Sequence, residues 1–191
     1  MAIEIELKFA AEESAFEGLM AESSEWTRYE MATTYYSDPD GQLSRLRWTL
    51  RRRFENGVSV CTIKTPHAGG GVNEFEVACG DIMEAIPKLV EMGAPKELLE
   101  YTTNGVEEVC AARFTRMAGK IVLDGAEAEL ALDKGELLGG GKSLPFVEVE
   151  VELKSGDLKA VAAYGEKLAK QFNLRPERKS KYKRALTLAG K

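Results

Sequence analysis

The sequence predicts an α+β protein in which strands curl into a barrel with a charged lumen and with helices on its apolar outer face. The first observation behind this prediction is Ile3–Phe9, which alternates strictly between apolar and charged residues. Successive side chains of a strand point to opposite faces, so Glu4, Glu6 and Lys8 share one face. An ordinary half-exposed strand, with its charged face toward water, would show the same pattern. The recurrence of this pattern along the chain is what favours a barrel with a charged lumen.

The second observation is that this alternation recurs in three later segments, with acids on the polar face. The acids are Glu74 and Glu76 in 73–77, Glu127, Glu129 and Asp133 in 127–133, and Glu148, Glu150 and Glu152 in 146–154. Each set shares a face with period two, as expected for a strand. One face of the predicted sheet is therefore dense in carboxylates.

The third observation is a basic segment, Arg45–Arg53, in which four arginines share a face. They are Arg45, Arg47, Arg51 and Arg53. Acids and arginines are thus segregated by strand, which is an unusual arrangement for a face that only contacts water. We therefore predict that both kinds of strand face one internal cavity.

The composition is that of an ordinary globular protein, with 191 residues, 44% apolar and 30% charged. This length predicts one domain, spanning 1–191. The formal net charge of -5 argues against a nucleic-acid binder that acts by bulk electrostatics. The chain starts directly with a strand and has no apolar run of about 18 residues, so we expect a cytoplasmic protein without membrane contact.

The cysteines and the single histidine exclude several kinds of site. Cys61, Cys79 and Cys110 are odd in number and far apart, so neither a disulfide framework nor a Cys-x-x-Cys site is indicated. His67 alone cannot supply a zinc site built on several histidines. Nucleophilic hydrolysis by a Ser-His-Asp or Cys-His arrangement is disfavoured for the same reason.

The other elements follow from periodicity and turn chemistry. Residues 55–57, Glu-Asn-Gly, predict a hairpin turn between the arms Leu43–Phe54 and Val58–Thr65. Asp81 predicts a helix N-cap and Gly93 the end of that helix. The remaining predicted strands are 27–37, 72–78, 106–117, 120–123, 128–133 and 144–154, and the remaining predicted helices are 11–21, 95–99 and 157–172. The basic tail, 176–184, is either a solvated segment or part of a site.

Residues 139–143, Gly-Gly-Gly-Lys-Ser, look like the end of a phosphate-binding P-loop. The first glycine of that motif is replaced by Glu136, and Pro145 and a strand follow where a helix is required. The helix N-terminus that would bind phosphate is therefore missing. We predict a hairpin loop here.

The first segment, Glu4-x-Glu6-x-Lys8, resembles the signature of the CYTH family, the triphosphate tunnel enzymes that include class IV adenylate cyclases, thiamine triphosphatases and inorganic triphosphatases. The resemblance continues in order along nearly the whole chain. Its further motifs are Arg45-Leu46-Arg47, Thr62-x-Lys64-x-Pro66, Glu74-x-Glu76, Arg113, Asp133-x-Gly135, Glu148-x-Glu150 and Ser180-Lys181-Tyr182. The family fold is an eight-stranded antiparallel barrel that forms a tunnel, so the resemblance implies that fold here.

The resemblance also implies roles for the charged residues. A triphosphate carries about four negative charges and needs several arginines and lysines, and its hydrolysis needs a divalent cation, Mg²⁺ or Mn²⁺, held by carboxylates. The implied metal-side acids are Glu4, Glu6, Glu148 and Glu150, with Glu76, Asp133 and Glu152 as further candidates. The implied phosphate-binding residues are Lys8, Arg45, Arg47, Lys64, Arg113 and Lys181. The implied catalytic set is Glu4, Glu6, Lys8 and Lys64.

Some charged residues keep two interpretations. Glu74, Glu127 and Glu129 are either part of the site or salt-bridge partners that hold arginines in place. Arg51 and Arg53 lie farther along their segment, where exposure to solvent is as plausible as function.

The function implied by the resemblance is metal-dependent hydrolysis of inorganic triphosphate or another simple triphosphate. The alternatives are an adenylate cyclase that makes cyclic AMP from ATP and a thiamine triphosphatase, for which the sequence shows no ring-binding surface. A non-catalytic anion binder is a third class, and the retained acids argue against it. The expected partner is a small-molecule triphosphate without nucleic acid or membrane, and a homodimer is compatible with the sequence.

Overall fold

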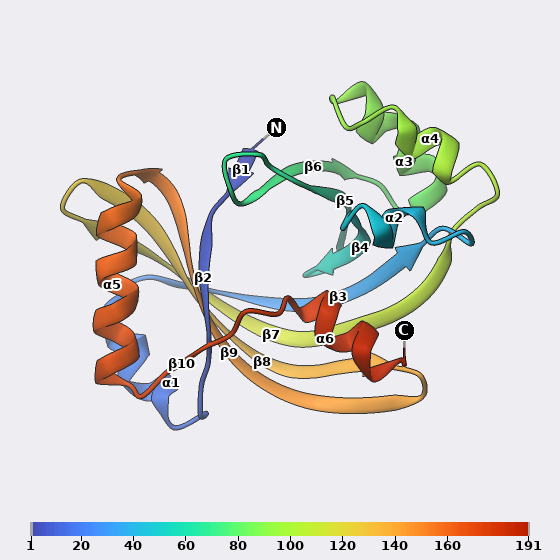
Figure 1. Ribbon diagram of the computed structural model, residues 1–191. Coiled ribbons are helices and arrows are strands. Elements are labelled where there is room, and N and C mark those ends of the chain that lie inside the picture. The colour runs from blue at the N-terminus through green and yellow to red at the C-terminus, as the bar shows by residue number, and fades with distance from the viewer. Residues whose placement is uncertain (1, 191) are drawn as a thin grey trace.

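A computed structural model describes residues 2–190, with side chains from residue 4 onward, so the side chain of Ile3 lies outside the described residues. The chain forms one large antiparallel sheet with helices around it (Figure 1). The strands are β1 (Ala2–Glu4), β2 (Glu6–Ala10), β3 (Trp26–Ser37), β4 (Thr49–Glu55), β5 (Val58–Pro66), β6 (Val72–Ala78), β7 (Glu107–Leu123), β8 (Ala126–Gly139), β9 (Lys142–Gly156) and β10 (Arg175–Pro176). The helices are α1 (Ala15–Leu19), the 3₁₀ helix η1 (Met20–Glu22), α2 (Gln42–Arg45), α3 (Ile82–Glu91), α4 (Glu97–Tyr101), α5 (Leu158–Gln171) and α6 (Lys181–Leu188). The predicted α+β class is confirmed.

The N-terminal segment connects the two ends of the sheet. The strand order is β1-β6-β5-β4-β3-β7-β8-β9-β2-β10, with β1 at one edge and β2 near the other. Residues Ala2–Glu4 pair with β6 and the following residues Glu6–Ala10 pair with β9. Because one short segment reaches both ends, the sheet must curl around a central space, as the prediction of a tunnel requires.

The structure differs from the predicted eight-stranded barrel in its closure. The sheet contains ten strand segments, and among residues 2–190 no ladder joins β6 directly to β9. The N-terminal segment pairs with these two strands in succession rather than side by side, and the interruption falls at Ile5. The sheet is therefore strongly curled but not a continuously hydrogen-bonded cylinder.

Two clusters of the apolar core lie on the outer face of the sheet, where the alternation predicts them. Leu130 of β8 and Val149 of β9 are fully buried in one cluster with Val161 and Leu168 of α5. A second cluster joins Ile63 and other residues of β5 and β6 to α3. Figure 1 shows α5 and the α3–α4 pair on separate parts of the sheet. The concave face carries the charged residues together with a third apolar cluster that packs against α6.

Local turn chemistry forms several elements as predicted. Asn56 and Gly57 have φ of 49° and 87°, the left-handed conformations that a tight hairpin turn requires. The Asp81 side chain accepts hydrogen bonds from the backbone N–H groups of Met83 and Glu84 and so caps α3. Gly140 and Gly141 also have positive φ and connect β8 to β9, so the P-loop-like stretch is a hairpin turn.

The strand predicted over Arg45–Arg53 is wrong in its first half. The Asp38 carboxylate accepts hydrogen bonds from the N–H groups of Gln42 and Leu43, both at 2.8 Å, and a short helix, α2, forms over 42–45. Leu43 is almost fully buried and anchors this helix. The strand β4 begins only at Thr49, because the capping hydrogen bonds and the burial of one leucine outweigh the alternation.

The basic tail is ordered and partly solvated, with Lys181 buried and Arg178, Lys179 and Lys183 exposed. Ser180 caps α6 by accepting a hydrogen bond from the Lys183 N–H at 3.1 Å. The helix contacts β7, β8 and β9, and both Lys181 and Ala185 are buried. Among the described residues, none of the helices has the length and apolar character needed to cross a membrane.

We expect Leu130→Ala to lower the free energy of unfolding by about 2–5 kcal/mol, because it leaves a cavity under α5. Urea denaturation followed by circular dichroism measures this change. Val122→Ala is the matched control: Val122 lies on the neighbouring strand β7 and is 73% exposed, so its effect should stay within about 0.5 kcal/mol. Equal effects of the two substitutions would contradict a core on the outer face.

Candidate functional site

The concave face of the sheet encloses a cavity of about 510 Å³. Eight acids and eight bases line it, so its formal charges balance. The acids are Glu4, Glu6, Glu55, Glu74, Glu76, Glu129, Glu150 and Glu152, and the bases are Lys8, Arg47, Arg51, Arg53, Lys64, Arg116, Lys154 and Lys181. Half-buried charges of this number persist only if they are paired with one another.

One wall of the cavity carries an alternating series of charges, here called the ion row. In spatial order its members are Glu4, Lys64, Glu74, Arg51, Glu76, Arg53 and Glu55, from strands β1, β4, β5 and β6. Each base lies between two acids. The wall therefore presents arginine and lysine groups that are already held in place.

The distances within the ion row show which contacts are closest. Glu74 Oε1 lies 3.1 Å from Arg51 Nη2 and 3.2 Å from Lys64 Nζ. Glu76 is more distant, at 3.7 Å from both Arg51 and Arg53, and it also accepts a hydrogen bond from Thr62 Oγ1 at 2.9 Å. Glu74 is thus shared by two bases, whereas the closest contacts of the row are Lys64 with Glu4 and Arg53 with Glu55.

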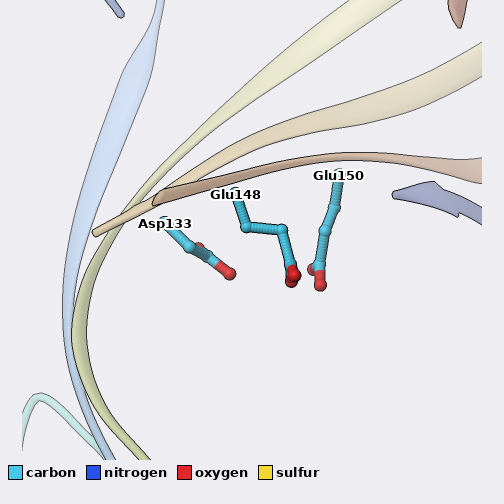
Figure 2. A group of neighbouring side chains, drawn as sticks. All are labelled: Asp133, Glu148 and Glu150. Carbon is cyan, nitrogen blue, oxygen red and sulfur yellow. The ribbon is translucent and has the colours of Figure 1, made fainter. Parts of the chain in front are cut away.

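The opposite wall contains a second set of paired charges, here called the Lys181 cluster. Three carboxylates, from Asp133, Glu148 and Glu150, converge with their oxygens within 4.8 Å of one another (Figure 2). Lys181 of α6 reaches into them, with Nζ 2.8 Å from Asp133 and 2.7 Å from Glu150, and it also contacts Glu148. Arg116 of β7 makes a bidentate contact with Asp133, both bonds 2.7 Å.

The carboxylates of the Lys181 cluster have the spacing of a metal site but a poor fit to one. Their compensating positive charge is already supplied by Lys181 and Arg116, and Arg184 also contacts Glu148. A divalent cation would have to displace a fully desolvated ammonium group. We conclude that these acids hold α6 against the sheet.

Two acids of the Lys181 cluster, Glu148 and Glu150, have pKa values shifted in opposite directions. Burial raises the pKa of Glu148 to about 7, although Lys181 partly offsets it. Burial alone would raise the pKa of Glu150 as well, but Lys181 and Arg116 outweigh it and hold that pKa well below the ordinary value of 4.5.

A third set of acids lines the open cavity. Glu6 lies opposite Glu152 across the β2–β9 ladder, and both side chains line the cavity together with Glu4. Burial raises the pKa of Glu6, as do the charges of Glu150 and Glu4, against the opposing effect of Lys8. Burial also raises the pKa of Glu152, against the effect of Lys154. Neighbouring carboxylates that repel one another in this way are hard oxygen ligands suited to Mg²⁺ or Mn²⁺.

The structure brings most of the site residues implied by the sequence to one cavity. Those that line it are Glu4, Glu6, Lys8, Arg47, Lys64, Glu76, Glu150, Glu152 and Lys181. Asp133 and Glu148 are fully buried beneath Lys181. Arg47 reaches the cavity from a turn with φ of 57° rather than from a strand.

Two arginines implied as phosphate ligands lie outside the cavity. Arg45 is exposed on α2 and donates a hydrogen bond to the backbone oxygen of Asp40 at 2.6 Å. Arg113 is exposed on β7, whose lumen side is formed by Phe114 and Arg116. The odd and even positions of β7 alternate across the sheet, so residue 113 cannot share the face of residue 116.

Arg51, Arg53 and Arg116 are the lumen arginines that sequence reasoning did not assign. Arg51 and Arg53 share the parity of Arg47, so the alternation itself was a usable signal for them. Arg116 could be found only by knowing that it pairs with Asp133 across the β7–β8 ladder. Strand register decides which arginine of β7 faces inward.

A curled antiparallel sheet whose inner face balances arginines and lysines against carboxylates defines a fold with a charged central cavity. The family model described as CYTH domain matches residues 2–186. The chain therefore belongs to the CYTH family, as the motifs in its sequence predict.

Comparisons with individual proteins agree with this family. The chain is 25% identical over 163 residues to an inorganic triphosphatase of Haemophilus influenzae, covering 84% of this chain and 46% of that protein. The chain thus spans about half the length of that relative. Among solved structures it is similar to the PH1819 protein of Pyrococcus horikoshii OT3, with a TM-score of 0.60, 25% identity and coverage of 97% and 99% of the two chains.

A second structural relative shares the fold at lower identity. The Hippeastrum protein HpAC1, for which a dominant triphosphatase activity is described, gives a TM-score of 0.64 at 22% identity and covers 100% of this chain and 97% of that one.

We expect Lys181→Met to destabilise the protein by about 3–5 kcal/mol at pH 8, because it leaves Glu150 and Asp133 with too little positive charge. The depressed pKa of Glu150 contributes stability above its unfolded value, near 4.5, which is lost as the pH falls through the folded value. Without Lys181 the carboxylate pKa values rise, so protonation at pH 5.5 should relieve much of the loss.

Denaturant unfolding at pH 8 and pH 5.5, with a chelator present, measures this difference. Lys183→Met is the control, because Lys183 lies on the same helix and is exposed. An equal loss of stability at both pH values would contradict the electrostatic role of Lys181.

Proposed function

We propose that this protein is a divalent-metal-dependent triphosphatase that hydrolyses inorganic triphosphate inside the cavity. The observation that carries the proposal is that one cavity contains both an ion row rich in arginine and, near its Glu4 end, the further carboxylates Glu6 and Glu152. A metal-bound triphosphate needs both kinds of side chain at once. The inorganic triphosphatase named among the relatives supports this choice of substrate.

The cationic groups of the cavity bind and orient the phosphates. Arg51 and Arg53 face the cavity, and Lys64 extends the same wall toward Glu4. Lys8 also faces the cavity and donates a hydrogen bond to Glu6 at 2.7 Å. Guanidinium groups give bidentate contacts to phosphate oxygens, so they fix the chain of phosphates relative to the acids.

The acids Glu4, Glu6 and Glu152 would hold the divalent cation, which neutralises phosphate charge and activates water when bound. Phosphoryl transfer requires positioning and charge stabilisation more than covalent chemistry. The residues around the cavity position the substrate, and the paired arginines stabilise its negative charge. The protein therefore needs no nucleophilic side chain for this reaction.

An organic triphosphate is the second candidate substrate, and one observation favours it. Tyr29 lines the central cavity and also an adjoining cavity of about 300 Å³. An aromatic side chain at this junction could stack on a nucleobase or a thiamine ring while the phosphates occupy the centre. ATP, with hydrolysis or cyclisation as the outcome, and thiamine triphosphate are the compounds to compare.

A phosphate-release panel with inorganic triphosphate, ATP and thiamine triphosphate, each with Mg²⁺ and Mn²⁺, tests the proposed function. We expect the highest kcat/KM with inorganic triphosphate, and no release in a chelator. Cyclic AMP is measured in parallel. Formation of cyclic AMP from ATP without triphosphate hydrolysis would replace the proposal by the cyclase alternative.

We expect Glu6→Gln to lower kcat by about a hundredfold or more, because an amide keeps the size of the side chain but loses the charge that holds the cation. Excess Mg²⁺ should not restore the rate fully. The control is Glu84→Gln, an equal change of charge at an exposed position of α3. A wild-type rate in Glu6→Gln would remove Glu6 from the metal site.

We expect Arg51→Ala to weaken triphosphate binding about ten- to hundredfold, the value of a charge-assisted contact of about 1.5–3 kcal/mol. Calorimetric titration with Ca²⁺ in place of the catalytic metal measures the affinity. Arg113→Ala is the matched control, because Arg113 is exposed outside the cavity. A larger loss in Arg113→Ala than in Arg51→Ala would contradict the observed register of β7.

A further inference from the structure

One acid of the ion row stands where an anion would bind. The Glu74 carboxylate contacts Arg51 Nη2 at 3.1 Å and Lys64 Nζ at 3.2 Å, and its side chain is only 17% exposed. Carboxylate and phosphate oxygens make the same charge-assisted contacts with guanidinium and ammonium groups. Glu74 therefore fills, between these two cations, the position of a phosphate oxygen.

The arginines beside Glu74 retain unused donors. The Nε–H groups of Arg51 and Arg53 are buried and have no hydrogen-bond partner, while their Nη2 groups contact carboxylates. Burial and the neighbouring charge of Arg51 lower the pKa of Arg53, so the acids of the row do not fully compensate this guanidinium. A buried donor without an acceptor costs free energy, which an entering oxyanion would recover.

The ion row nevertheless opposes a weakly charged anion. It contains four acids and three bases, and the whole cavity contains equal numbers of each. An anion that reaches Arg51 and Lys64 must separate them from Glu74, and it then lies close to a displaced carboxylate. The cost of separating these ion pairs is nearly the same for every anion, whereas the attraction grows with the number of anionic oxygens that reach the bases of the cavity.

We propose that Glu74 is a specificity-determining residue that occupies the phosphate position between Arg51 and Lys64 in the free protein and excludes anions too weakly charged to displace it. The inference rests on the proposed function, because it assigns the same two cations to the phosphates of the substrate. The contacts of a metal-bound triphosphate outweigh the free energy needed to displace Glu74, whereas those of orthophosphate, the product, do not. Glu74 thereby limits product binding.

A purely positioning role for Glu74 predicts the opposite result. If Glu74 only held Arg51 and Lys64 in place, its removal would let both side chains move and would weaken the binding of any anion. If it competes with anions, its neutralisation strengthens their binding. The sign of the change in affinity separates the two roles.

The test is calorimetric titration of orthophosphate into the metal-free protein, with a chelator present. Glu74→Gln should bind orthophosphate about ten- to hundredfold more tightly than wild type, because one negative charge within a few ångströms of the anion is removed. Glu74→Asp keeps the charge and should stay within about threefold of wild type. Glu84→Gln on the outer surface, with the same change of net charge, should equal wild type.

Unchanged or weaker orthophosphate binding in Glu74→Gln would overturn the proposal. Should that variant fail to fold, Glu76→Gln takes its place. We expect it to raise the affinity for orthophosphate by a smaller factor, because Glu76 lies 3.7 Å from Arg51 and Arg53. An unchanged affinity in Glu76→Gln would equally overturn the proposal. Hydrolysis of triphosphate is measured separately. Tighter orthophosphate binding without any triphosphatase activity would overturn the proposed function alone, and activity without tighter binding would overturn the role of Glu74 alone.

Discussion

The pairing of half-buried charges is the constraint on which the rest of this structure depends. The inner face of the sheet carries eight acids and eight bases around a cavity of about 510 Å³. Charges so poorly solvated are stable only beside opposite charges. This requirement restricts which strands can face one another across the cavity. Two of the apolar clusters lie on the outer face, where α5 covers residues such as Leu130 and Val149, and a third packs against α6 beside the charges.

The same constraint divides the acids into two groups with different tasks. In the Lys181 cluster, the acids receive their positive charge from the protein itself, and the result is a helix, α6, attached to the sheet. Glu6 and Glu152, by contrast, line the open cavity, and each has one lysine partner among the described ion pairs, Lys8 and Lys154 respectively. The second group therefore gains most from a divalent cation, and the proposed chemistry is assigned there.

The predictions from sequence are confirmed where residues close together in the chain determine the local structure. The alternation of 146–154 fixed the two faces of β9, and the Asn56-Gly57 turn fixed the β4–β5 hairpin. Prediction failed at 42–47, where hydrogen bonds from the Asp38 side chain form a helix that the arginine spacing does not suggest. It left two interpretations open for the tail, because α6 is stabilised by contacts with β7, β8 and β9 that no local pattern records.

The sequence by itself determined the strand faces, the segregation of acids from arginines and membership of the CYTH family, since these depend on residue types at fixed spacings. Only the tertiary structure decided that Arg116 rather than Arg113 faces inward, that Lys181 compensates three acids, and that Glu74 bridges Arg51 and Lys64. These contacts join strands and a helix that are distant in the chain. Their partners depend on strand register and on the curvature of the sheet, which form only when the whole chain packs.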